Sequence, residues 1–190
     1  MAKNRTPRRV ILDLAVTLDG FIEGKNGEVD WCIMDPDMDF SVFLARIDTI
    51  LYGRKSYDLW GQYIPADEAP ESEKEIWNLV HSKKKYVFSR TQKEPNQQAT
   101  FINDHIPEVV SQLKKEPGTD IWLYGGASLI TTFINLRLID EFRLSIHPVV
   151  LGEGTPLFVD LKQRLDLKLV DSKVFSSGVV QVIYHWNDHE

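Results

Sequence analysis

The sequence contains little cysteine: Cys32 is the single thiol among 190 residues. One thiol excludes an intramolecular disulfide framework and is typical of proteins in a reducing compartment. Long apolar runs are also missing, because none approaches the ~18 residues that a membrane helix needs, and no signal-peptide core follows the basic start. These absences predict a cytoplasmic protein that makes no membrane contact.

Positive charge is scarce overall, with 22 Lys and Arg against 28 Asp and Glu, a net charge of −6. A nucleic-acid-binding surface needs clustered cations, so this balance argues against a nucleic-acid partner. Four cations do gather near the start, at Lys3, Arg5, Arg8 and Arg9. We expect residues 1–7 to form a flexible tail and this basic cluster to be solvated by water rather than to bind phosphate.

The composition, 43% hydrophobic and 26% charged, fits one globular domain over residues 1–190. Strand-like segments are expected at 10–16, 48–52, 85–89, 100–102, 121–124 and 141–150. Helices are expected from residue 40 onward, at 54–60, 72–81 and 106–115, and from the Gly125-Gly126 pair to residue 134. A hairpin is expected from 167–175 and 179–186. This order predicts a three-layer α/β fold, a mostly parallel central sheet with flanking helices and a C-terminal antiparallel hairpin.

Three local patterns refine these expectations. Phe40, Phe43, Leu44 and Ile47 follow the spacing of one helix face, so the first helix is expected to include all four. Ser72 and Glu75 form a capping-box pattern that places the start of the next long helix at Ser72. Residues 17–27 contain three glycines and are expected to form a mobile loop.

Two strand-to-helix junctions carry most of the chemical information. In one, a strand ends at Gly53 and Arg54-Lys55-Ser56 follows; in the other, Tyr124 precedes Gly125-Gly126-Ala127-Ser128. Helix N-termini expose unpaired N–H groups, and glycine lets an anion approach the backbone closely, so the two junctions together suit a diphosphate. Glycine at such a joint is more often only a turn, and neither the G-x-G-x-x-G nor the P-loop fingerprint is present.

A third element, Ser89-Arg90-Thr91, follows another expected strand. Ligands of parallel sheets bind at the carboxyl ends of the strands, where all three elements are expected. Guanidinium groups match phosphate oxygens, so Arg54 and Arg90 suit a phosphate monoester such as the 2′-phosphate of NADP.

The acidic segment Asp35-Pro36-Asp37-Met38-Asp39 precedes the first helix. Calcium binding in an EF-hand is rejected, because the sixth and twelfth positions are Phe40 and Arg46. Helix capping explains at least two of the three acids. The remaining hypothesis is that Asp37 or Asp39 points into the cleft to bind or protonate a heterocycle, and the spacing does not separate the two.

The other candidate groups are less informative. The five histidines are scattered, so a metal site is not expected. No nucleophile–base pair for a phosphate-ester hydrolase is visible, and Cys32 is interpreted as a small half-buried apolar residue. Trp31, beside the acidic segment, is a candidate wall for a planar ligand.

The order and spacing of these segments resemble the dihydrofolate reductase-like superfamily, which includes the reductase domain of the bifunctional riboflavin-biosynthesis deaminase-reductase. The resemblance covers most of the chain and is carried by Leu18-Asp19-Gly20-Phe21-Ile22, Asp30-Trp31, Asp39-Phe40 with Phe43, Gly53-Arg54-Lys55-Ser56-Tyr57, Ser89-Arg90, Tyr124-Gly125-Gly126-Ala127, Leu138-Ile139-Asp140-Glu141 and the segment from Pro148 to Gly154. It implies the fold stated above. The long 138–154 segment is more similar to the riboflavin branch, while that branch's deaminase motifs are not found here.

The resemblance also implies a cofactor and a site. NADPH would lie across the strand ends, in contact with Ala15, Val16, Asp19, Gly20, Ile22, Gly53, Arg54, Lys55, Ser56, Ser89, Arg90, Tyr124, Gly125, Gly126, Ala127, Ser128 and Leu129. Asp39 matches the substrate-binding carboxylate of dihydrofolate reductases, which favours it over Asp37 as the catalytic residue. The substrate would contact Trp31, Asp37, Phe43 and Ser145.

These observations favour an NADPH-dependent reductase that transfers hydride to a small heterocycle of the pteridine or ribosylaminopyrimidine type. The alternatives are an inactive nucleotide-binding module and an oligomeric scaffold on the same fold. A homodimer is expected, because the hairpin and the strand from Phe142 to Val150 offer an apolar edge that a second copy would cover.

Overall fold

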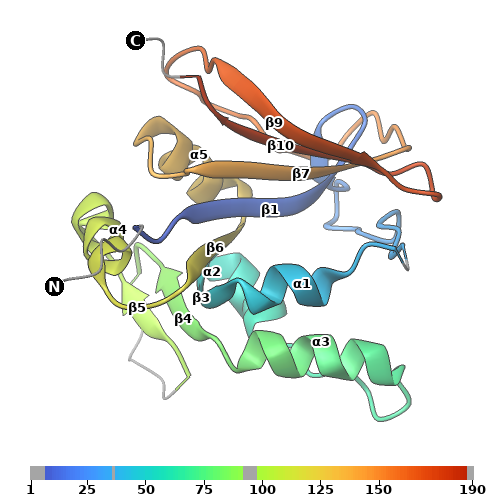
Figure 1. Cartoon of the computed structure of the whole chain (residues 1–190), viewed down its shortest axis with the longest axis horizontal. Coiled ribbons are helices and arrows are strands. Elements are labelled where there is room, and N and C mark those ends of the chain that lie inside the picture. The colour runs from blue at the N-terminus through green and yellow to red at the C-terminus, as the bar shows by residue number, and fades with distance from the viewer. Residues whose placement is uncertain (1–6, 36, 92–97, 188–190) are drawn as a thin grey trace, which may run out of the picture.

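The central sheet has eight strands, seen nearly edge-on in Figure 1, and the computed structural model describes residues 7–35, 37–91 and 98–187. The strands are β1 (Val10–Thr17), β3 (Ile47–Gly53), β4 (Lys84–Phe88), β5 (Thr100–Ile102), β6 (Asp120–Gly125), β7 (Glu141–His147), β9 (Leu167–Val174) and β10 (Val180–Trp186). Their order is β5-β4-β3-β6-β1-β7-β10-β9. The first six in this order pair in parallel, and β10 pairs antiparallel with both β7 and β9. This confirms the predicted fold class.

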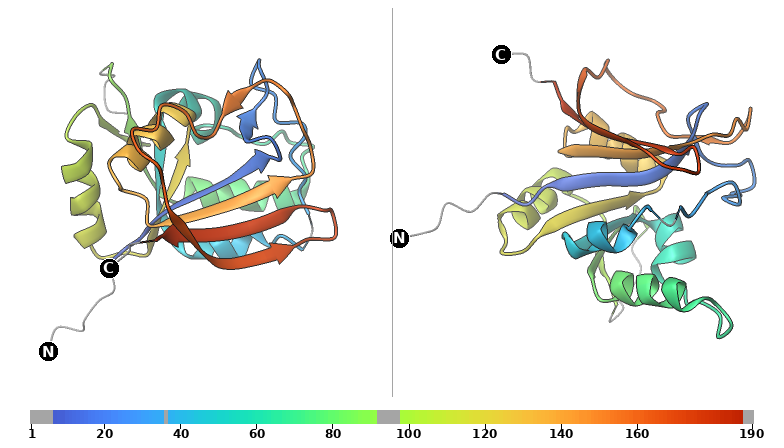
Figure 2. Two further views of the ribbon diagram at one scale, coloured as in Figure 1. Left: turned by 90° about the horizontal axis from the view of Figure 1, so that it is seen from above. Right: turned by 45° about the vertical axis from the view of Figure 1, so that its right-hand side comes forward.

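Helices cover both faces of the sheet. They are α1 (Phe40–Ala45), α2 (Arg54–Ser56), the π-helix η1 (Tyr57–Gly61), α3 (Glu71–His81), α4 (Ile106–Lys115) and α5 (Ala127–Asn135). Side chains of α4 and α5 pack in one apolar cluster, and those of α1, α3 and η1 in the other. Figure 2 shows α1 and α3 on the opposite side of the sheet from α5.

The apolar run of β1 follows from its position between these layers. Val10 and Leu12 face the cluster of α4 and α5, whereas Ile11 faces the cluster of α1 and α3. All three are fully buried. A strand covered on both faces is expected to be apolar at consecutive positions, as this one is.

Several predicted boundaries are wrong. Ile47 begins β3 and does not continue α1, which ends at Ala45. The N-cap of α3 is Pro70, whose carbonyl accepts the N–H groups of Glu73 and Lys74, so Ser72 lies inside the first turn and is not the cap. The expected loop at 17–27 contains β2 (Phe21–Glu23), which pairs with β8 (Thr155–Pro156).

The basic cluster is also not a solvated tail, as far as its described members show. Arg8 is 5% exposed and donates hydrogen bonds to the carbonyls of Thr119 and Leu113, to Thr49 and to Asp48. Lys3 and Arg5 lie outside the described residues. Burial of Arg8 is possible because carbonyl, hydroxyl and carboxylate oxygens surround its guanidinium.

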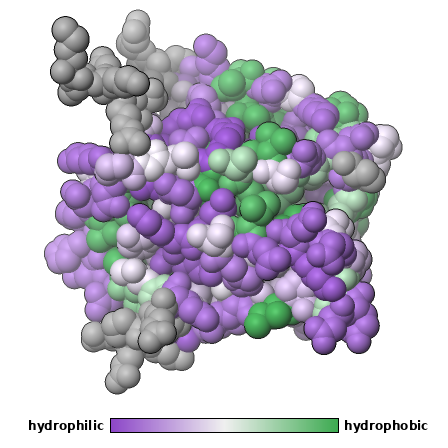
Figure 3. All heavy atoms as spheres, turned by 60° about the horizontal axis from the view of Figure 1, so that its bottom comes forward, coloured by the Kyte–Doolittle hydropathy of each residue, from purple (hydrophilic) through white to green (hydrophobic). Residues whose placement is uncertain are grey.

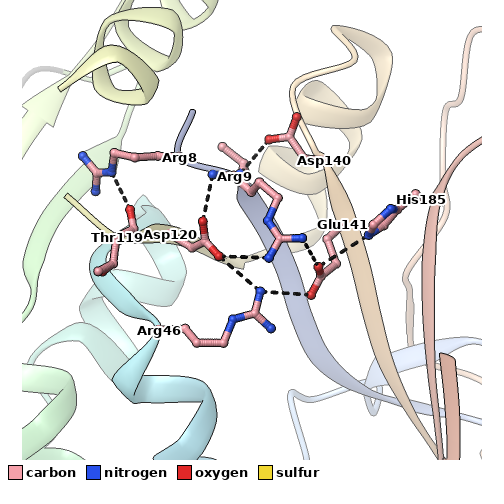
Figure 4. Close-up of polar contacts among 9 residues, drawn as sticks. Arg8, Arg9, Arg46, Thr119, Asp120, Asp140, Glu141 and His185 are labelled. Atoms are coloured by element: carbon pink, nitrogen blue, oxygen red, sulfur yellow. Dashed lines mark hydrogen bonds and ion pairs between the residues drawn. The ribbon is translucent and has the colours of Figure 1, made fainter. Parts of the chain in front are cut away.

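Arg9 takes part in a second charged network at the amino ends of β1, β6 and β7 (Figure 4). Its guanidinium lies 3.0 Å from Glu141 and 3.3 Å from Asp120. Arg46 pairs with the same two carboxylates, and His185 Nε2 lies 3.5 Å from Glu141 Oε2. This network joins the strand ends opposite those where a parallel sheet places its ligand.

The expected apolar edge belongs to the hairpin alone, because β7 lies between β1 and β10. Strand β9 is at the edge, with Leu169, Val170 and Val174 exposed. The homodimer stays a prediction.

Candidate functional site

A cavity of about 1170 Å³ lies over the carboxyl ends of the parallel strands. Residues at the ends of β1, β3, β4, β6 and β7 line it, together with side chains of α1, η1 and α3 and the first turn of α5. Three of the expected elements meet there: the two glycine junctions and the Ser89-Arg90 segment. The parallel sheet therefore places its cavity where such sheets bind ligands.

The two glycine junctions touch each other. A Cβ atom on Gly53 would lie 3.3 Å from both the carbonyl oxygen of Gly125 and the nitrogen of Gly126. A Cβ atom on Gly126 would lie 3.0 Å from Ser56 Oγ. A side chain at either position would be tightly packed against its neighbours, so glycine favours the close approach. Helix α5, nine residues long, begins next to this contact, and its first turn lines the cavity.

Cationic side chains border the same end of the cavity. Arg54 Nε donates to Asp58 Oδ2 at 2.7 Å, and its guanidinium lies 5.5 Å from the ring centre of Phe101. Lys55 is 80% exposed and lies 3.8 Å from Glu23. Arg90 also lines the cavity. We call this end, with Gly53, Arg54, Lys55, Ser56, Ser89, Arg90 and Gly126 to Leu129, the anion end.

The other end contains a buried carboxylate that the sequence reasoning missed. Asp13, in the middle of β1, is 7% exposed and pairs with Arg143 on β7, with 3.3 Å between Oδ1 and Nε. Strand register fixes this pair, because Asp13 and Arg143 are direct neighbours between β1 and β7. The guanidinium of Arg143 lies over the Phe43 ring at 5.4 Å. An acidic residue within an otherwise apolar strand is a sequence signal that indicates a functional site, and Asp13 carries this signal.

The ionisation of Asp13 is strongly perturbed. Burial raises its pKa from 3.8 to about 7, because the charged form loses hydration. The positive charges of Arg143 and Arg46 oppose this rise, while the negative charge of Glu141 adds to it. At neutral pH the side chain is therefore present in both protonated and ionised forms and is able to donate a proton.

Alternate residues of β7 continue the polar lining. Ser145 follows Arg143 on the same face, and its Oγ accepts a hydrogen bond from Gln181 Nε2 at 3.2 Å. His147 comes next, and its Nδ1 accepts the N–H of Ile33 at 3.2 Å. Burial lowers the pKa of His147, which favours the neutral ring needed for that acceptor.

His147 also holds the preceding loop against the cavity. Its Nε2 lies 4.0 Å from Cys32 Sγ, and the Trp31 ring packs on its edge with centroids 5.3 Å apart. Burial raises the pKa of Cys32, consistent with an unreactive thiol. Trp31 lines the cavity as expected.

Most of the expected site residues line this one cavity. They are Ala15, Ile22, Trp31, Gly53, Arg54, Lys55, Ser56, Ser89, Arg90, Tyr124, Gly126, Ala127, Ser128, Leu129 and Ser145. The cavity lining does not include Val16, Asp19, Gly20, Asp37, Asp39, Phe43 or Gly125. Val16 and Phe43 are buried in the apolar clusters, and Asp19 accepts the backbone N–H groups of Leu151 and Gly152.

The expectation that Asp37 or Asp39 points into the cleft is not met. Asp39 is exposed and caps α1, accepting the N–H and the hydroxyl of Ser41 at 3.0 and 2.5 Å. These hydrogen bonds lower its pKa, so it is a poor proton donor at neutral pH. Asp37 is exposed as well. The capping hydrogen bonds thus occupy the carboxylate of Asp39, which the sequence spacing placed beside the apolar face of the first helix.

The described part of the chain, residues 7–35, 37–91 and 98–187, contains neither a candidate metal site nor a candidate membrane span. No group of three or more His, Cys, Asp or Glu side chains there is arranged to hold a metal ion. No helix there is long and apolar enough to cross a membrane.

Comparison with known proteins gives close matches. The chain is 76% identical to the uncharacterised protein YyaP of Bacillus subtilis (strain 168), covering 98% of this chain and 100% of that protein. A structure described as a candidate riboflavin biosynthesis protein from Shewanella sp. PV-4 is 26% identical, with a TM-score of 0.76 over 94% of this chain and 99% of that one.

Two more distant structures share the fold. The Thermotoga maritima diaminohydroxyphosphoribosylaminopyrimidine deaminase/5-amino-6-(5-phosphoribosylamino)uracil reductase has a TM-score of 0.66 at 15% identity, over 95% of this chain and 57% of that one. Enterococcus faecalis dihydrofolate reductase, complexed with NADP(H), has a TM-score of 0.65 at 16% identity, over 95% and 97%. The model of the RibD C-terminal domain matches residues 8–181. The chain therefore belongs to the RibD C-terminal domain family, whose fold is that of reductases.

Proposed function

We propose that this protein is an NADPH-dependent reductase acting on a small heterocycle of the pteridine or ribosylaminopyrimidine type. The observation that carries the proposal is the composition of the cavity. One end combines touching glycine junctions, a helix N-terminus and cations, and the other end contains a buried acid with a pKa of about 7. A dinucleotide phosphate and a ring that accepts a proton require these two environments.

The anion end fits the phosphates of NADPH. The crowded contact of Gly53 with Gly125 and Gly126 leaves backbone, and no side chain, at the start of α5. There the N–H groups of the first turn and the hydroxyls of Ser56 and Ser128 would bind the diphosphate, and Arg54 or Arg90 the 2′-phosphate. When bound, the nicotinamide supplies the hydride for the reduction.

The residues at the other end would complete the reduction. Reduction of a C=N bond requires one proton in addition to the hydride, and protonated Asp13 is placed to supply it. Arg143 holds the carboxyl group in position through the 3.3 Å contact. The Ser145 hydroxyl, fixed by Gln181, offers a hydrogen bond that would orient the ring.

Replacing Arg54 by alanine is expected to weaken NADPH binding about tenfold and NADH binding much less. The lost interaction would be a charge-assisted hydrogen bond to the 2′-phosphate, which NADH lacks. Calorimetric titration of both dinucleotides into the wild type and Arg54→Ala measures the difference. Arg164→Ala, which removes an exposed guanidinium paired with Asp166, is the matched control.

The same titration tests the function as a whole. Micromolar or tighter binding of NADPH by the wild type, with clear preference over NADH, supports the proposal. Equal losses for both dinucleotides in Arg54→Ala would contradict the 2′-phosphate assignment. Binding of neither dinucleotide by the wild type would leave a reductase fold that serves another purpose.

A further inference from the structure

Aromatic side chains dominate the end of the cavity that contains Asp13. We call this the ring compartment and define it by the lining residues Asp13, Trp31, Asp35, Phe40, Trp60, Glu73, Ile76, Trp77, Trp122 and Arg143. Trp122 joins its parts: Nε1 donates to the carbonyl of Asp13 at 3.0 Å, and its ring meets Phe40 with centroids 5.5 Å apart. Trp122 thus connects the buried acid to the aromatic side chains of the compartment.

The outer wall comes from η1 and α3. Trp60 and Trp77 lie nearly parallel, with an interplanar angle of 9° and centroids 6.3 Å apart, and Tyr63 packs against both. Trp60 and Trp77 are only partly buried, so ring surface remains accessible from the cavity. On the face that carries α1 and α3, hydrophobic side chains show among hydrophilic ones (Figure 3). Flat apolar walls of this kind favour a planar aromatic ligand.

The charges of the compartment are unfavourable for a phosphate. Asp35 and Glu73 contribute carboxylates to its lining, and Asp13 adds a third negative charge in its ionised form. Hydrogen bonds from Ser177 and Asp37 lower the pKa of Asp35, which is therefore ionised at neutral pH. The guanidinium of Arg143, the cation of the compartment, is already paired with Asp13 and packed on Phe43.

The remaining cations that line the cavity in the described part of the chain, Arg54, Lys55 and Arg90, belong to the anion end. Under the proposed function the cofactor phosphates use them. A phosphate on the substrate would then face carboxylates without an unpaired cation, and like charges at close range repel strongly where water is scarce.

We propose that the ring compartment takes a planar aromatic heterocycle that carries no phosphate group. Binding of the planar ring does not rest on the proposed function, whereas the discrimination against a phosphate and the use of the ligand as a substrate do. Within the two substrate types considered above, the compartment thus selects free bases, nucleosides or ribityl compounds over phosphoribosyl compounds.

Matched pairs of ligands test this inference. Riboflavin and FMN share three fused rings and differ by one phosphate, and guanosine and GMP form the same comparison with two rings. Each is titrated into the full-length protein in the presence of saturating NADP⁺, which occupies the anion end. We expect the phosphate-free member of at least one pair to bind, and its phosphorylated partner to bind at least tenfold more weakly. Equal or tighter binding of the phosphorylated members, or no binding by either pair, would overturn the proposal.

Variants test where the ligand binds and what determines its preference for ligands without a phosphate group. Trp77→Leu is expected to weaken the phosphate-free ligand about tenfold through lost stacking. Trp186→Phe is the control, because Trp186 lies outside the cavity lining and packs on Phe142.

Leu59 is 55% exposed at the cavity wall, so Leu59→Arg should fold normally. It is expected to raise the affinity for FMN relative to riboflavin about tenfold. A Trp77→Leu variant that binds as the wild type does would contradict the assignment of the site.

The outcomes also separate the two proposals. If riboflavin or guanosine binds in a Trp77-dependent way but NADP⁺ and NADPH do not bind, the ring compartment stands and the reductase proposal fails. If NADPH binds with the expected Arg54 dependence and the phosphorylated ligand binds more tightly in both pairs, the reductase proposal stands and the present inference fails.

Discussion

Replacing Asp13 by asparagine is expected to lower turnover by about 10²–10⁴-fold, the usual contribution of a positioned proton donor. Asparagine has nearly the same size and keeps a polar oxygen facing Arg143, but it has no proton to transfer. NADPH affinity should change less than twofold, because Asp13 is not among the residues proposed to bind the cofactor phosphates. Steady-state rates with a substrate found by screening, together with calorimetry, measure the two effects.

The pH dependence gives a second readout of the same residue. Burial, reinforced by the negative charge of Glu141, raises the pKa of Asp13 to about 7, against the opposing charges of Arg143 and Arg46. The acid is protonated below this pH, so wild-type turnover should be high there and fall as pH rises through about 7. Asp13→Asn should lose this fall.

Asp35→Asn is a comparison variant rather than a neutral control: it removes the charge of another buried carboxylate in the cavity lining and leaves Asp13 in place. Its oxygens accept the backbone N–H groups of Asp37 and Ser177, so it holds a loop in place and is expected to affect turnover less than tenfold. Asp13→Asn turnover within tenfold of the wild type, or a wild-type rate that stays constant through pH 7, would show that another group donates the proton.

The anion end was predictable from sequence because its signals are local. A strand, a glycine and a helix start follow one another within a few residues at Gly53 and again at Gly125-Gly126. Since the carboxyl ends of parallel strands meet at one edge, the fold class alone placed both junctions at the same edge of the sheet. The contact between Gly53 and that glycine pair depends in addition on the pairing of β3 with β6, which the sequence did not predict.

The acid of the ring compartment was not predicted, because its signal is not local. The role of Asp13 depends on its ion pair with Arg143, a residue distant in sequence. The register of β1 and β7 brings Arg143 opposite Asp13. Asp39 was preferred because it matches the substrate-binding carboxylate in the family resemblance, whereas its spacing beside the apolar face of the first helix did not separate it from Asp37. Helix capping depends on one hydrogen bond to Ser41 that helical spacing does not reveal. Long-range strand pairing therefore places Asp13 in the cavity, and local helix capping keeps Asp39 out of it.

The same limitation explains the wrong expectation for Arg8. Four cations in nine residues are typical of a solvated tail, yet the Arg8 side chain is 3% exposed. Its partners Asp48, Thr49, Leu113 and Thr119 are all far away in the sequence. Leu113 lies in the last turn of α4, where a cation also interacts favourably with the helix dipole.

Replacing Asp48 by alanine is therefore expected to lower the free energy of unfolding by about 3 kcal/mol, at the lower end for a broken buried ion pair. The variant leaves the buried guanidinium of Arg8 without its carboxylate and also removes the acceptor of the Thr119 N–H at 2.8 Å. Urea unfolding followed by tryptophan fluorescence measures the change. The value is placed at the lower end because the Asp48 side chain is 34% exposed, so water replaces part of the interaction.

Two further variants make this result interpretable. Asp166→Ala removes the acid of the exposed Arg164 pair and should change stability by less than about 1 kcal/mol. The double variant Arg8→Met/Asp48→Ala should lose less stability than the sum of the single variants, because removing both charges leaves no unpaired ion in the interior. If Asp48→Ala is as stable as Asp166→Ala, the Arg8 cluster does not fix the first strand to the sheet, and the start of the chain behaves as the solvated tail that its composition indicates.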